Sequence, residues 1–273
     1  MSFAPVLLGT GYAGWTFLKR TLPGQTAAFN KAPEITRDEA YFRANIAKAK
    51  TADDLVSDRR LLRVALGAFG LEGDLNSKAF IKKILSDGTL TPGALANRLA
   101  DKQYLKLSAA FGYGDFSTPR TAISTFPDKI LAEYKTRQFA AAVGQQSDDM
   151  RLGLNAETEL AALAARKNTS EDTKWLTIMG NPPLRRVMEK ALGLPASLAS
   201  LDLDRQLGSF KDKAQRIFGD TSVSQFTDPA KVEAVLRRFL VRSEADALGT
   251  GTSSQAAALQ MLQNSAAFAR QRF

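Results

Sequence analysis

Apolar residues recur every three or four positions along most of this chain, and alternation of apolar and polar residues is almost absent. A spacing of three and four places side chains on one face of an α-helix, whereas alternation is typical of a strand. Residues 55–69 follow the helical spacing and predict a helix that ends at Gly70, because glycine tolerates the left-handed conformation after a last turn. The pattern as a whole predicts an all-α protein.

Other helices are expected from the same spacing and from residues that begin or end helices. A short helix over residues 12–21 is expected to stop at Leu22-Pro23-Gly24, because proline breaks a helix interior. Further helices are predicted over residues 78–85, from Thr91 onward, and over residues 101–111, 171–178, 182–192, 203–218 and 229–242.

Residues 127–166 permit a helix almost throughout. One uninterrupted helix of about 39 residues would be roughly 58 Å long. Gly144 and Gly153 each weaken a helix by about 1 kcal/mol relative to alanine. The segment therefore forms either one long connecting helix or two helices separated near residues 145–149.

Two segments of similar sequence indicate an internal repeat. Residues 58–71 (DRRLLRVALGAFGL) and 181–194 (NPPLRRVMEKALGL) each begin with a capping residue and end with a glycine that follows an apolar residue, and residues 101–113 match more loosely. One explanation of the likeness is that any amphipathic helix with a glycine cap has this general form. The other is duplication, which predicts two pseudo-repeated helical subdomains joined by the long central helix in an elongated molecule.

The expected organisation divides the chain into five parts. They are an N-terminal segment with a short helix (1–35), a first helical unit (36–126), a connecting long helix (127–166), a second helical unit (167–247), and a flexible linker with a C-terminal amphipathic helix (248–273). Leu259, Leu262 and Ala266 share one face of that last helix, which either folds back on the core or docks on a partner. Trp15 is a further candidate docking residue, with core packing as the alternative.

The residue types that are missing limit the chemistry. The chain has no Cys and no His, which excludes disulfides, thiolate nucleophiles and a Ser-His-Asp triad. We expect no catalytic, cofactor-binding or metal-binding residues, and a function other than catalysis. No apolar run approaches the roughly 20 residues that span a bilayer, and the first residues lack the features of a secretory signal. We therefore expect no membrane span and a cytoplasmic location.

Basic residues exceed acidic ones, with 37 Lys and Arg against 28 Asp and Glu and a net charge of +9. Such an excess attracts nucleic acid, acidic lipids or acidic protein surfaces. The charges are spread along the chain, so solvated helix faces are the favoured explanation. The candidate anion contacts are Arg59, Arg60, Arg63, Arg237 and Arg238.

The stretch VLLGTGYAGW, residues 6–15, has the glycine spacing of a dinucleotide-binding turn. That turn works only between a strand and a helix, with an acidic residue after a second strand about 20 residues on. Pro5 leaves room for a strand of residues 6–8 at most, and no apolar run precedes Glu34 at the acidic position. The glycines are therefore expected to loosen the chain before a short helix rather than to hold a cofactor.

Four stretches resemble an uncharacterised bacterial family, the domain of unknown function DUF1217. They are GYAGWTFLKRT, DLVSDRRLLRVALGAFGLEGDLNSKAFIKKIL, ALANRLADKQYLKLSAAFGYGDF and YKTRQFAAAVG. The likeness is strongest over residues 10–155. It implies no activity and no catalytic residues, because the family has none assigned. Many members are encoded beside flagellar genes, which implies an association with the flagellum or its assembly.

The resulting hypothesis is a non-catalytic helical protein that binds protein partners, including flagellar components. Proteins of the flagellar rod, hook and filament often pair N- and C-terminal helices, and they leave the cell through the flagellar apparatus without a cleaved signal. Export by that route is therefore an alternative to a cytoplasmic location. A basic helical module that binds nucleic acid is the alternative function. The sequence leaves the oligomeric state open.

Overall fold

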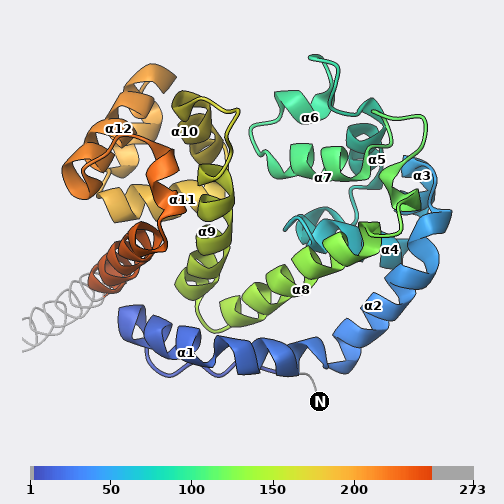
Figure 1. Cartoon of the computed structure of the whole chain (residues 1–273), viewed down its shortest axis with the longest axis horizontal. Coiled ribbons are helices and arrows are strands. Elements are labelled where there is room, and N and C mark those ends of the chain that lie inside the picture. Colours follow the sequence, from blue (N-terminus) through green and yellow to red (C-terminus); the bar gives the residue numbers. More distant parts are fainter. Residues whose placement is uncertain (1–2, 248–273) are drawn as a thin grey trace, which may run out of the picture.

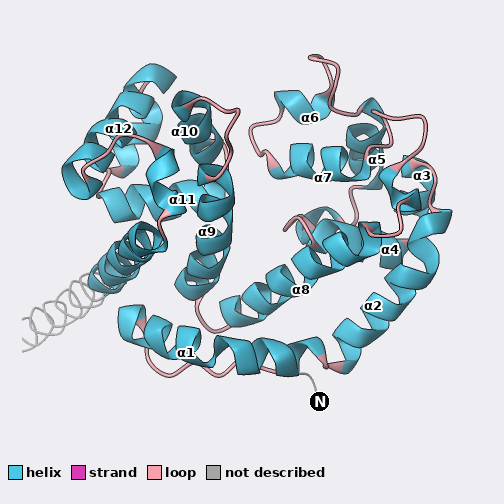
Figure 2. Ribbon diagram, in the orientation of Figure 1, coloured by secondary structure: helices cyan, strands magenta, loops and turns pink. Residues whose placement is uncertain are grey.

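The computed structural model describes residues 3–247, and every regular element in this range is a helix (Figures 1 and 2). The all-α prediction is confirmed. The helices are α1 (Gly11–Asn30), α2 (Pro33–Asn45), α3 (Ala52–Ser57), α4 (Arg59–Gly67), α5 (Lys78–Asp87), α6 (Leu95–Arg98), α7 (Gln103–Phe111), α8 (Phe126–Gly144), α9 (Asp148–Ala164), α10 (Glu171–Met179), α11 (Pro182–Leu192) and α12 (Leu203–Phe218). Residues 229–247 are also helical. Short 3₁₀ turns are η1 (Ile46–Lys48), η2 (Glu72–Asp74), η3 (Arg120–Ala122), η4 (Ala196–Ser200) and η5 (Val223–Thr227).

The helices α8 and α9 form a V at the centre of the molecule (Figure 1). One lobe, α3–α7, gathers beside α8, and the other, α10–α12 with the helix over residues 229–247, gathers beside α9 (Figure 1). The helix α1 packs against both arms of the V, and α2 continues from it toward the first lobe. The two lobes therefore share a base made by the N-terminal helices and the V.

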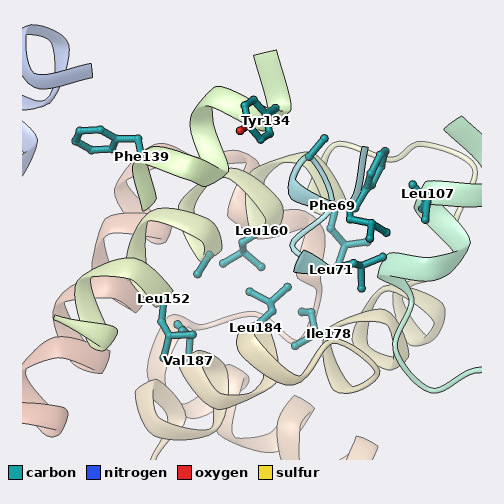
Figure 3. Packing of buried hydrophobic residues seen from close by; sticks show 14 of the residues in the cluster. Phe69, Leu71, Leu107, Tyr134, Phe139, Leu152, Leu160, Ile178, Leu184 and Val187 are labelled. Atoms are coloured by element: carbon teal, nitrogen blue, oxygen red, sulfur yellow. The ribbon is translucent and has the colours of Figure 1, made fainter. Parts of the chain in front are cut away.

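Buried side chains from both lobes belong to one continuous hydrophobic cluster. Figure 3 shows Leu152 and Leu160 of α9 facing Leu184 and Val187 of α11, with Tyr134 of α8 farther along the cluster. The helices α4 and α11 are the most clearly amphipathic elements that face the V, and each turns its apolar stripe toward it. Burial of these stripes holds the lobes to the centre.

Residues 127–166 form two helices, so the single connecting helix is not observed. The first ends at Gly144, and the second begins after Ser147, whose Oγ accepts a hydrogen bond from the Met150 amide. A side chain at position 144 would lie 2.5 Å from Cδ of Arg151. The glycine and the serine cap allow the chain to reverse direction between the two arms of the V.

The prediction that α1 stops at residues 22–24 is wrong, because this helix continues through Pro23 to Asn30. Proline removes one backbone hydrogen bond and strains a helix interior. Trp15 and Leu18 before Pro23 and Phe29 after it are all buried in the shared core. The packing of both halves of the helix outweighs the local cost of the proline.

Three other boundaries differ from the sequence-based expectation. Residues 55–69 are divided at Asp58, whose carboxylate accepts hydrogen bonds from the amides of Arg60 and Leu61 and caps α4. The helix expected from Thr91 begins only at Leu95. The helix α2 has no counterpart among the predicted helices. A capping side chain in the middle of an apolar pattern is therefore sufficient to divide one helix into two.

The two similar segments have similar ends. Asp58 caps α4 and Asn181 caps α11, and Gly70 and Gly193 both adopt a left-handed conformation, with φ of +72° and +66°. Their neighbours differ, since α4 packs on α2 and α8 whereas α11 packs on α9 and α10. A duplicated unit therefore stays a prediction.

Candidate functional site

The glycines of the N-terminal motif shape a turn and a close helix contact. Gly9 and Gly11 have φ of +82° and +57°, a region that favours glycine. A Cβ at Gly14 would lie 2.5 Å from Cε of Met150 and 2.6 Å from the carbonyl oxygen of Gly9. No strand is found within residues 3–10. The motif therefore begins α1 and seats it against α9, in a geometry unlike the strand–turn–helix of a dinucleotide site.

The start of α1 is joined to the helix over residues 229–247 by polar contacts. The Thr10 hydroxyl donates to Glu244 Oε1 at 2.7 Å, and the Tyr12 hydroxyl donates to Glu233 Oε1 at 2.9 Å. The Arg237 guanidinium lies 5.5 Å from the centre of the Tyr12 ring. We call these five residues the terminal junction, because they join the two ends of the described chain.

Two features of the terminal junction show how closely the segments meet. The hydrogen bond to Glu233, together with burial, raises the pKa of Tyr12 above its usual value of 10.0. Gly11 has no side chain, and a Cβ there would collide with the carboxylate of Glu244. The glycine is therefore required both by its backbone conformation and by its neighbour on the other helix.

The helix over residues 229–247 has one apolar and one basic face. Its buried apolar residues are spaced by three or four positions and comprise Val232, Val235, Leu236, Phe239 and Leu240. Val241 is 49% exposed and, with Arg237, Arg238 and Arg242, lines a shallow hollow of about 250 Å³. The Arg238 Nε donates to the carbonyl of Ala191 at 2.9 Å, near the C-terminal end of α11, where a cation is favourable.

The arginines predicted as anion contacts fall into two separate groups. Arg59, Arg60 and Arg63 lie on α4 in the first lobe. Arg237 and Arg238 lie on the helix over residues 229–247 in the second lobe. The structure does not bring the two groups together.

Most of these arginines already have partners within the protein. Arg59 donates to the side chain of Asn76 at 3.1 Å, and Arg60 lies 3.9 Å over the ring of Tyr41. Arg63 is paired with the buried carboxylate of Asp38.

Of the predicted docking residues, Trp15 is the one that the structure describes. Its side chain is fully buried and its ring lies 3.0 Å from where a Cβ of Gly153 would stand. Trp15 is therefore a packing residue between α1 and α9, not a docking residue. Leu259, Leu262 and Ala266 lie outside the described residues.

A largely buried carboxylate that the sequence did not single out, with a side chain 13% exposed, joins the two lobes. Glu159 of α9 pairs with Arg137 of α8 at 2.7 Å and with Lys106 of α7 at 3.5 Å, and it accepts hydrogen bonds from the side-chain amides of Gln103 (Nε2) and Asn181 (Nδ2). Burial disfavours the charged form, but the two cations and the hydrogen bonds outweigh it and hold the pKa of Glu159 below its usual value of 4.5. We call these five residues the Glu159 cluster.

A second buried polar group lies in the second lobe. The Lys174 ammonium, 3% exposed, donates to the Ala164 carbonyl at 3.1 Å, to Glu171 at 3.0 Å and to Ser224 Oγ at 2.5 Å. Glu171 also accepts hydrogen bonds from the amides of Val223 and Ser224. The three acceptors match the three donors of an ammonium group, so the arrangement ties η5 to α10.

Among residues 3–247, no group of three or more acidic side chains is arranged to hold a metal ion. No helix in the same range has both the length and the apolar character needed to cross a membrane.

Comparisons with known proteins give a family and a fold. The family model described as a protein of unknown function (DUF1217) matches residues 68–232, more than half of the chain. The crystal structure of protein AGR_C_984 from Agrobacterium tumefaciens is similar, with a TM-score of 0.72 and 23% sequence identity over 88% of this chain and 96% of that one. No curated protein matches the sequence significantly. At this identity the structural likeness shows the helical fold alone.

Proposed function

We propose a function from the premise that this chain belongs to the DUF1217 family of proteins of unknown function: it is a non-catalytic helical protein that binds protein partners at the bacterial flagellum or during its assembly. The flagellar part of the proposal comes from the gene context of the family. The interaction part comes from the geometry of this chain.

The terminal junction is the observation that supports the proposal most. It holds the helix over residues 229–247 against the start of α1 through Thr10 and Tyr12. Proteins of the flagellar rod, hook and filament often pair N- and C-terminal helices, and in this chain the start of α1 contacts the last helix that the structure describes. The junction places residue 247, the last described residue, on an anchored helix, from which the predicted docking face of Leu259, Leu262 and Ala266 follows in the sequence.

The internal use of the buried polar groups agrees with a role other than catalysis. Glu159 is paired with Arg137 and Lys106, and Lys174 is paired with Glu171, within the protein. No observation favours nucleic-acid binding as a second function, because the basic groups on α4 and on the C-terminal helix lie in different lobes.

A deletion strain complemented with variants of the gene tests the proposal. We expect the deletion to reduce swimming or filament number and the full chain to restore both. Leu262→Asp, on the predicted docking face, is expected to abolish rescue, and Gln263→Asp, one position away on the polar side, is expected to retain it. Co-purification of the protein with hook–basal-body preparations provides the second measurement.

The outcomes separate the proposal from its alternatives. Wild-type motility and filaments in the deletion strain, together with no partner lost from the Leu262→Asp variant, would contradict it. A shift of DNA or RNA at low salt that disappears with added salt would instead support the nucleic-acid alternative.

A further inference from the structure

A cavity of about 890 Å³ is lined by residues from the end of α1, the first half of α2, α4 and α8. Volumes of this size are in the range of pockets that hold small organic ligands, about 300–1,000 Å³. None of the residues of the terminal junction lines the cavity. Its role is therefore a separate question from partner binding.

One side of the cavity is cationic. Arg37 of α2 and Arg60 and Arg63 of α4 line it, with Asp38 and Glu34 as the carboxylates on the same wall. Asp38 is paired with Arg63 and also accepts a hydrogen bond from the Tyr134 hydroxyl at 2.6 Å. The negative charge of Asp38 is therefore compensated by Arg63, and this carboxylate does not pair with Arg37 or Arg60.

The two remaining arginines have donors to spare. Arg37 donates through Nε to the Pro33 carbonyl at 3.0 Å, and its two terminal nitrogens have no hydrogen-bond partner among residues 3–247. Arg60 makes one long hydrogen bond, 3.4 Å, to the Arg37 carbonyl, and its planar face rests on Tyr41. This stacking fixes the guanidinium while its edge stays available to an anion.

The other side of the cavity is apolar. It is formed by Phe29, Ile35 and Ala141, with the ring of Phe3 set edge-on to Phe29 at 6.2 Å. An apolar wall beside unpaired guanidinium donors is suited to a ligand that has an anionic group and an apolar body.

We propose that this cavity binds an amphipathic anion, a carboxylate on an aliphatic body. Arg37 and Arg60 hold the carboxylate, and the aliphatic body lies against Phe29, Ile35 and Ala141. The proposal does not rest on the flagellar function, and either can fail without the other.

Displacement of a fluorescent probe tests the proposal on the full-length protein. The probe is anilinonaphthalene sulfonate, which combines an anionic group with an aromatic body, and the competitors are decanoate and its uncharged counterpart decanol. Decanoate is expected to displace the probe at concentrations at least about tenfold lower than decanol, because only the carboxylate pairs with the arginines.

Two neighbouring arginines on α4 provide the matched pair of variants. Arg60→Gln removes a charge from the cavity, whereas Arg59→Gln removes one from outside it, where Arg59 contacts Asn76. We expect decanoate affinity to fall about tenfold in Arg60→Gln and to remain unchanged in Arg59→Gln. Ala141→Leu, which fills the apolar side, is expected to weaken decanoate and decanol alike.

Three results would overturn the proposal. They are failure of decanoate to bind at about 1 mM, equal weakening in the Arg59→Gln and Arg60→Gln proteins, and equal affinities for decanoate and decanol. Both arginines are exposed, and thermal unfolding of each variant shows whether it is folded.

Discussion

Tyr12 and Glu233 are 221 residues apart in the sequence and joined by a hydrogen bond of 2.9 Å in the fold. The bond connects the first turn of α1 with the helix over residues 229–247. Thr10 and Glu244 form a second contact about three turns farther along that helix. The terminal junction is thus a long-range contact between the two ends of the described chain.

Removing the Tyr12 hydroxyl should loosen this junction. Tyr12→Phe keeps the ring and its contact with Arg237 but loses the bond to Glu233, so we expect a stability loss of about 0.5–1.5 kcal/mol. Hydrogen–deuterium exchange should increase in residues 229–247. Tyr104→Phe, which removes a hydroxyl bonded to Asp74 in the other lobe, should leave exchange in that helix unchanged.

Gly14 and Gly24 lie on the same helix and should respond oppositely to alanine. A methyl group at position 14 meets the backbone of Gly9 and the end of Met150, whereas position 24 has open space around it. Gly14→Ala should lower the free energy of unfolding by about 1–3 kcal/mol. Gly24→Ala should leave it unchanged or raise it by up to about 1 kcal/mol. Chemical denaturation measures both, and equal effects would contradict the packing role of Gly14.

The Glu159 cluster should contribute strongly to stability. Glu159→Gln leaves Arg137 and Lys106 without their counter-charge in a largely buried site, and we expect a loss of about 2–4 kcal/mol. Glu157→Gln is a matched control on the same helix, because Glu157 pairs with Lys19 at the surface, and its loss should be at most about 1 kcal/mol. Similar losses in the two variants would show that the cluster does not join the lobes.

The same carboxylate should make stability depend on pH in acid. The folded protein holds the pKa of Glu159 below 4.5, so the stabilisation is complete above that pH and is lost as the pH falls through the lower, folded value. The difference in unfolding free energy between wild type and Glu159→Gln should therefore be constant near neutral pH and decrease below about pH 4.5. Denaturant titrations at several pH values measure it, and a difference that grows in acid would contradict the assignment.

Lys174 provides a further test of a structural role. Lys174→Met removes the partner of Glu171 and Ser224 in a buried site, and we expect a stability loss of about 2–4 kcal/mol. Lys211→Met is the control, because Lys211 pairs with Asp172 nearer the surface and its loss should be below about 1 kcal/mol. Denaturation of the two variants under the same conditions gives the comparison, and a Lys174→Met protein as stable as wild type would exclude the tie between η5 and α10.

Local signals in the sequence predicted several elements well. The helices α11 and α12 have the predicted bounds, 182–192 and 203–218, because a capping residue, an apolar stripe and a final glycine coincide in each. The predicted end of α1 at Pro23 is wrong, because the free energy gained by burying Phe29 beyond the proline exceeds the local cost of the proline in the helix. The candidate site was less predictable, because Tyr12, Glu159 and Lys174 acquire their roles only from distant partners.

The sequence by itself determined the helical class, most helix positions and the lack of Cys and His chemistry, because periodicity, caps and composition act within a few residues. It also indicated the family. Only the tertiary structure decided that α8 and α9 reverse direction, that Trp15 is buried, and that Tyr12 meets Glu233. These depend on which apolar faces pack together and which buried charges find partners, and such contacts between distant residues leave no local pattern in the chain.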